Sequence, residues 1–172
     1  SGLGGAHANL VDHHRAGRFA PFSLADVVEY PVQSSAFGRL RMRWRQHPKR
    51  VLDLSKQRFG PEDVFHITDQ EQAHLIPPRS ARRPKMVVTV HDVFHLFPSS
   101  QRIALTDGKT TVGTSVVHVG DQRPGMIRKR DLKKLKAGLA RADLLVCDSE
   151  HTRLRCNEAF PNVPVSYTHL TL

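Results

Sequence analysis

The chain has 172 residues, of which 39% are hydrophobic and 24% charged, so it has the size and composition of one folded domain and not of a disordered segment. Its 26 Lys and Arg outnumber 16 Asp and Glu, and the net charge of +10 predicts an anionic partner. No apolar run approaches the ~18 residues of a membrane-spanning helix. Two cysteines and the absence of a signal-peptide pattern predict a protein of the reducing cytoplasm.

The first half of the chain alternates helix and strand patterns. A glycine-rich loop over residues 1–5 opens it and leads into helical spacing that stops at Gly17. The predicted elements are a helix over 6–16, a strand over 24–30, a helix that begins in the basic stretch 39–50 and continues toward residue 59, a strand over 63–68, and one or two helical turns over 69–76.

The second half holds the clearest patterns. Residues 86–90 (MVVTV) form a β-branched, continuously apolar run, which is typical of a central parallel strand. Asp107-Gly108 predicts a hairpin turn, although the segment 99–126 fits the alternation poorly. The remaining predicted elements are a strand over 115–119, an amphipathic helix over 127–142, a buried strand over 142–148, and a helix from Ser149 to about residue 160. This alternation predicts an α/β fold with a parallel sheet and helices on both faces.

Three short motifs each give only weak evidence for a ligand or metal site when taken alone. The glycine loop before a helix suits a phosphate-binding turn, but it lacks G-x-G-x-x-G spacing and an ordinary loop is an equal alternative. Gly108-Lys109-Thr110 is not a P-loop, because Ile103 stands where the first glycine is required. The segment 91–95 (HDVFH) resembles a zinc motif, but it follows a strand, so its two imidazoles are not expected to converge and no metal is predicted.

Two strands end in polar residues. His91 follows the strand 86–90, at the edge where open α/β sheets bind ligands, and it could hold a substrate oxygen or share a proton. The alternative is a histidine that merely caps the strand. The sequence from Asp148 to Arg153 likewise follows a strand and opens a helix, and its alternative interpretation is an N-cap with a solvated first turn.

In chain order, these segments resemble the N-terminal half of a retaining GT-B glycosyltransferase of the large family that includes many bacterial mannosyl- and glucosyltransferases. The resemblance rests on the glycine loop with its helix, on the strands 63–77 and 87–98 with their exits, and on the segment 140–153 (ARADLLVCDSEHTR). It implies a Rossmann-like acceptor-side domain over residues 1–165, with the first strand missing and the donor domain absent. Residues 166–172 resemble translated adapter sequence and are expected to be a non-native tail.

The resemblance also implies roles for particular residues. Gly4 and Gly5 would line the cleft near the donor phosphates, and His91 would be catalytic and face the reacting sugar. Residues that would contact substrate or donor are Asp92, Ser149, Glu150 and Arg153. The implied reaction moves a sugar from a nucleotide sugar to a glycan or lipid acceptor with retention and without a metal or other cofactor, and the fragment alone is expected to be inactive.

Two other functions stay open at this point. The basic helix around Lys133 could instead belong to a non-catalytic module that binds polyanions or an acidic membrane, including peripheral contact at the inner face of the membrane. Aromatic residues make up only 6% of the chain, which argues against sequence-specific nucleic-acid recognition. A Rossmann domain of a different enzyme, with the glycine loop binding a dinucleotide, is the third interpretation.

Overall fold

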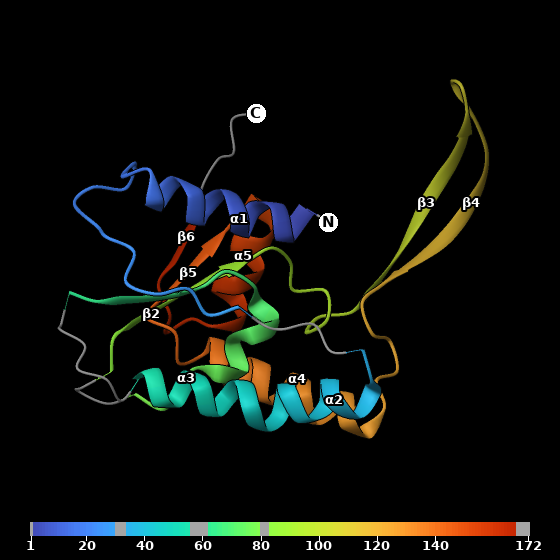
Figure 1. Ribbon diagram of the computed structural model, residues 1–172. Helices are drawn as coiled ribbons and strands as arrows, with labels where there is room; N and C mark the ends of the chain where they lie inside the picture. Colours follow the sequence, from blue (N-terminus) through green and yellow to red (C-terminus); the bar gives the residue numbers. More distant parts are fainter. Residues whose placement is uncertain (1, 30–33, 56–61, 80–82, 168–172) are drawn as a thin grey trace. The chain divides into compact units, whose positions relative to one another are not determined.

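The computed structural model describes residues 2–29, 34–55, 62–79 and 83–167 (Figure 1). The chain divides into two compact units. The first consists of Ser1–Asp63 and Ser80–Pro84, and the second of Val64–Arg79 and Lys85–Leu172. All described strands belong to the second unit.

The first unit is helical in its described part. Helix α1 (Gly2–Arg15) is followed by a continuous helical stretch of α2 (Ala36–Arg41), the π-helical turn η1 (Met42–Gln46) and α3 (His47–Ser55). Ser35 caps α2 by accepting a hydrogen bond from the Gly38 backbone N–H at 2.9 Å. The helix expected in the basic stretch 39–50 is therefore confirmed as far as Ser55, and its expected continuation toward residue 59 lies outside the described residues.

Two expectations about the first unit are wrong. Residues 24–29 form no strand, and Asp26 offers a local reason because its carboxylate accepts a bond from the Val27 backbone N–H at 2.7 Å. Gly4 and Gly5 were expected in a loop, but α1 begins at Gly2 and includes both in its first turn. The cost of glycine in a helix is smallest at such an end, where the N–H groups have no partner within the helix in any case.

The second unit is built on a four-stranded parallel sheet of order β1-β2-β5-β6. Its strands are β1 (Val64–Ile67), β2 (Lys85–Val90), β5 (Leu144–Cys147) and β6 (Val165–Tyr167). Between them lie the 3₁₀ helix η2 (Gln70–Leu75), α4 (Met126–Leu139) and α5 (Glu150–Ala159). The strand expected over 86–90 is interior to the sheet, which confirms its predicted central position.

Within this sheet, the spatial order of the strands is also their order along the chain, so each connection leads to the neighbouring strand in one constant direction. Right-handed crossovers that always advance in one direction place their helices on one face of a sheet. Burial agrees, because Met86, Val88, Val90 and Leu145 are at most 1% exposed and cluster with Leu139 of α4. The fold class is thus confirmed as α/β with a parallel sheet flanked by helices, while helices on both faces remain a prediction.

A long hairpin interrupts the alternation between β2 and α4. Strands β3 (Ser99–Asp107) and β4 (Thr110–Val119) pair antiparallel along their length and extend away from the sheet (Figure 1). The turn is at Gly108, whose positive φ of 62° suits glycine. At the base, a side chain on Gly120 would collide with the Phe94 carbonyl, so glycine is required there. The predicted turn is confirmed, and the strand expected over 115–119 is part of β4.

The end of the described chain also adds to the sheet. Strand β6 pairs with β5, with Ser166 opposite Val146 and Tyr167 opposite Cys147. The expected domain boundary after residue 165 therefore falls inside a strand. Residues 168–172 lie outside the described residues.

Candidate functional site

The candidate site lies where β2 and β5 end. Val90 and Cys147 are paired in register, so the residues that follow them, His91 and Asp148, leave the sheet side by side. The Nδ1 atom of His91 lies 2.9 Å from Oδ2 of Asp148. The two side chains are 22% and 31% exposed, so the pair is partly shielded and still reachable from solvent.

The second ring nitrogen of His91 is also engaged. Its Nε2 atom lies 3.1 Å from the carbonyl oxygen of Thr68, which follows β1. A carboxylate and a carbonyl are both acceptors, and a neutral imidazole can donate from only one nitrogen. A neutral ring therefore satisfies one of these two acceptors, and a ring that carries a proton on both nitrogens satisfies both.

The backbone of His91 is held as firmly as its ring. Its N–H donates to Oε1 of the buried Gln70 at 3.1 Å, and its carbonyl accepts from the hydroxyl of Thr152 at 3.2 Å. Thr152 is 3% exposed and in turn accepts from the Ser149 hydroxyl at 2.8 Å. We call His91, Asp148, Thr68, Gln70, Ser149 and Thr152 the His91 network.

Ser149 joins this network by capping helix α5. Its Oγ accepts from the Thr152 backbone N–H at 3.1 Å, which confirms the predicted N-cap. One residue therefore both starts the helix and orients the Thr152 hydroxyl toward His91. The N-terminus of α5 adds the positive end of a helix dipole beside Asp148.

The other predicted site residues form local contacts. The Asp92 carboxylate accepts from the Phe94 backbone N–H at 3.2 Å. Glu150 and Arg153 form an exposed ion pair along α5, and the Arg153 guanidinium lowers the pKa of Glu150. Gly4 and Gly5 belong to the first unit. Of the predicted residues, the structure therefore joins His91 and Ser149 in one network.

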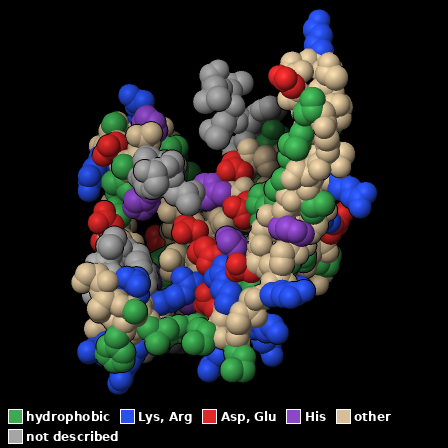
Figure 2. All heavy atoms as spheres, turned by 90° about the vertical axis from the view of Figure 1, so that its right-hand side faces the viewer, with side chains coloured by type: hydrophobic (Ala, Val, Ile, Leu, Met, Phe, Trp, Pro, Cys, Tyr) green, Lys and Arg blue, Asp and Glu red, His purple; other side chains and the backbone are tan. Residues whose placement is uncertain are grey.

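A second cluster beside this edge was missed by the sequence analysis. Arg128 of α4 donates to Glu71 through two bonds of 3.1 Å, to Asp121 at 2.9 Å and to Asp131 at 3.1 Å. Hydrogen bonding to Glu71 raises the pKa of the guanidinium, and the Arg128 bond in turn lowers the pKa of Asp121. Figure 2 shows acidic, basic and histidine side chains gathered beside the hairpin on this face.

Some members of the His91 network were not predicted as site residues, and the sequence marks some of these members more clearly than others. Asp148 follows its strand as His91 follows β2, so the topology alone could have paired them. Thr68 contributes a backbone carbonyl, and Gln70 is one polar residue in a helical turn, so neither has a distinctive pattern. Their roles depend on β1 lying next to β2, which the sequence did not specify.

The two histidines of the segment 91–95 face different partners. His91 meets Asp148, whereas Nδ1 of His95 lies 3.7 Å from the Asp121 carboxylate. Among the described residues, no three His, Cys, Asp or Glu side chains are grouped so that they could hold a metal ion. In the same part of the chain, no helix has the length and apolar character to cross a bilayer.

Comparisons with protein-family models, with curated proteins and with solved structures found no significant match to this chain.

Proposed function

We propose that this chain is the acceptor-side domain of a GT-B glycosyltransferase, which moves a sugar from a nucleotide sugar to a glycan or lipid acceptor with retention. The observation that carries the proposal is the His91–Asp148 pair at the carboxyl edge of a parallel sheet. Open α/β sheets bind their ligands at that edge. The order of the strand exits along the chain is also a feature on which the proposed resemblance to this family rests.

The His91 network suggests how the residue would act. Asp148 holds Nδ1, so Nε2 is the nitrogen that can turn from the Thr68 carbonyl toward a bound ligand. An N–H donor at that position would stabilise the negative charge on a departing phosphate or hold a sugar hydroxyl. Asp148 would be a positioning residue, because its carboxylate contacts Nδ1 and orients the ring.

The test is steady-state glycosyl transfer in the longer protein that the proposal implies, with a donor domain following this chain. We expect His91→Ala to lower kcat/KM by roughly 10²-fold or more, and His95→Ala to change it far less. Assays are run well below the melting temperature of each variant. Equal small losses would make His91 a structural cap, and robust transfer by the 172-residue chain alone would refute the assignment.

A second function is favoured by a separate observation. Helix α4 exposes Lys129, Arg130, Lys133 and Lys136 while it buries Leu135 and Leu139. Such a basic face suits a non-catalytic module for polyanions or acidic membranes. Binding of polyphosphate or acidic vesicles that falls steeply with salt, together with no response to acceptor glycans, would favour this function over glycosyl transfer.

A further inference from the structure

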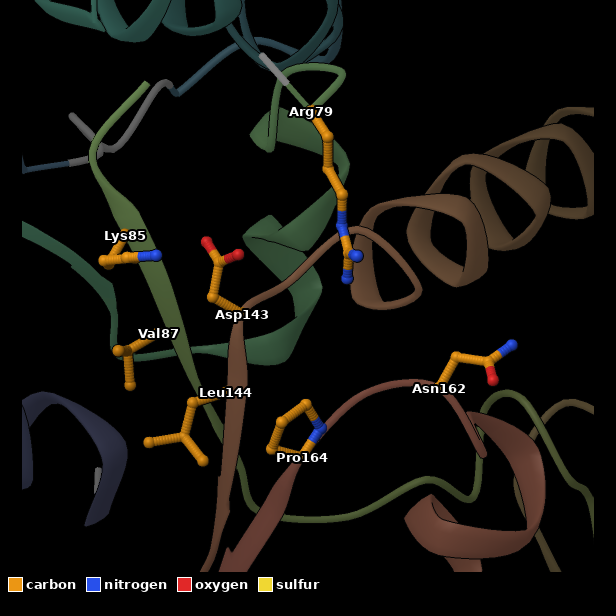
Figure 3. A pocket seen from close by; sticks show the side chains of 7 residues that line it. All are labelled: Arg79, Lys85, Val87, Asp143, Leu144, Asn162 and Pro164. Carbon is orange, nitrogen blue, oxygen red and sulfur yellow. The ribbon is translucent and has the colours of Figure 1, made fainter. Parts of the chain in front are cut away.

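The amino ends of the strands hold a second candidate site. An open pocket of about 500 Å³ lies where β2 and β5 begin and where the chain enters β6 (Figure 3). Because the strands are parallel, this is the opposite edge of the sheet from His91. The residues that line it belong neither to the His91 network nor to the Arg128 cluster.

One side of the pocket is apolar. Val87 and Leu144 are register partners on neighbouring strands, so their side chains stand next to each other on one face of the sheet. Pro164 adjoins them at the start of β6, held by a 2.9 Å bond from the Leu145 backbone N–H to its carbonyl. This wall suits the C–H face of a small ring.

The other side is polar and charged. Figure 3 shows the Asp143 carboxylate between the side chains of Lys85 and Arg79, with Asn162 on the adjoining loop. Asp143 is anchored to Met86 twice, through its backbone N–H and through Oδ2, at 2.8 Å in each case. Arg79 is steadied by a 3.0 Å bond to the Ala142 carbonyl. The Asp143 and Arg79 groups are therefore preorganised.

Lys85 has unused binding capacity. Within the part of the chain that the structure describes, its ammonium group has no hydrogen-bond or ion-pair partner. Among the lining residues that the structure describes, two cations and one carboxylate give a net charge of +1, and the +10 charge of the whole chain adds a field that attracts anions. The described lining thus combines two cations with an anchored carboxylate and an apolar wall.

We propose that this pocket binds an anionic sugar, of which a sugar phosphate is the simplest example. The anion would contact Lys85 and Arg79, the hydroxyls would bond to Asp143 and Asn162, and the ring would lie on the apolar wall. A simple anion would gain nothing from Asp143, whose negative charge opposes it, and an uncharged apolar ligand would leave both cations unpaired. The proposal is independent of the function proposed for the His91 edge.

The first experiment measures binding to the 172-residue chain by NMR titration, with glucose 6-phosphate, glucose, inorganic phosphate and leucine as probes. We expect glucose 6-phosphate to bind at least ~10-fold more tightly than each of the others and to shift the pocket amides. Equal binding of inorganic phosphate would overturn the proposal in favour of a simple anion site. Tighter binding of leucine would indicate a zwitterion site, and no binding by any probe would also overturn it.

The second experiment compares two variants with the same change of charge. We expect Lys85→Glu to weaken glucose 6-phosphate binding ~10-fold or more, and Lys109→Glu, in the exposed turn of the β3–β4 hairpin, to weaken it less than ~2-fold. Equal losses in the two variants would show a general field effect and overturn the proposed site.

Asp143→Asn tests the acceptor role separately. The amide oxygen can still accept from the Met86 N–H, so the fold is expected to tolerate the change. We expect sugar phosphate binding to weaken about 3-fold, since a carboxylate accepts from hydroxyls more strongly than an amide does. Tighter binding would mean that Asp143 only repels the ligand and would contradict the proposal.

Discussion

The two edges of the sheet use the same strands in opposite ways. At the carboxyl edge, His91 is bonded through both ring nitrogens, its N–H and its carbonyl, so its hydrogen-bonding capacity is met within the protein. At the amino edge, Asp143 is anchored but Lys85 points into an open pocket with no partner in the described part of the chain. The polar groups of the carboxyl edge bond to one another, whereas the amino edge has donors available for a ligand. Stability should therefore respond mainly to substitutions at the carboxyl edge, and binding of the anionic sugar to substitutions at the amino edge.

The two edges should differ most in their effect on stability when His91→Ala is compared with Lys85→Ala. His91→Ala removes the ring that contacts the Asp148 carboxylate and the Thr68 carbonyl, and we expect it to lower the free energy of unfolding by about 2–3 kcal/mol. Lys85→Ala, on an exposed side chain, should change it by less than about 0.5 kcal/mol. Urea unfolding measures both, and equal effects would contradict the comparison.

A smaller effect is expected inside the His91 network. Thr152→Val preserves the shape of the side chain but removes the hydroxyl that links Ser149 to the His91 carbonyl. Because that hydroxyl is buried, we expect a loss of about 1–2 kcal/mol, measured by thermal or urea unfolding. Thr152→Ser retains the hydroxyl and should recover part of the loss. If Thr152→Val is tolerated and Thr152→Ser is not, packing and not hydrogen bonding accounts for the role of Thr152.

Much of the parallel sheet could be predicted from sequence because its signals are local. The β-branched run at residues 86–90, the Asp107-Gly108 turn and the Ser149 cap each depend on a few neighbouring residues, and all three are found where the sequence placed them. Strand β6 was missed because it is only three residues long and extends into a segment interpreted as a tail. The strand expected over 24–30 failed because a side-chain bond at Asp26 satisfies the backbone locally.

The candidate sites were predicted less completely, for a different physical reason. His91 could be singled out because it follows the strongest strand. Its partners Gln70 and Thr68 meet it only because β1 lies beside β2, and strand order is a property of the whole sheet. The amino-edge pocket gave no signal at all, because Arg79, Asp143 and Asn162 come from three separate connections.

The smallest expected effect is a dependence on pH at the carboxyl edge, where charge-assisted bonds are concentrated. The bond from Arg128 lowers the pKa of Asp121 in the folded chain below the ordinary value of ~3.9. The folded state therefore holds the Asp121 proton less tightly than the unfolded state does. Its contribution to stability is present above the unfolded pKa and is lost as the pH falls through the folded pKa.

Carboxyl NMR titration of Asp121 measures this directly in two variants that each remove one positive charge. Arg128→Gln should move the Asp121 midpoint upward toward the ordinary value, because the 2.9 Å bond is gone. Arg123→Gln removes an exposed guanidinium nearby and should leave the midpoint close to that of the unmodified chain. Since Asp121 is exposed, the change in melting temperature between pH 5 and pH 2 should differ only slightly between these variants. An Asp121 midpoint that stays low in Arg128→Gln would show that the bond from Arg128 is not the cause of the lowered pKa.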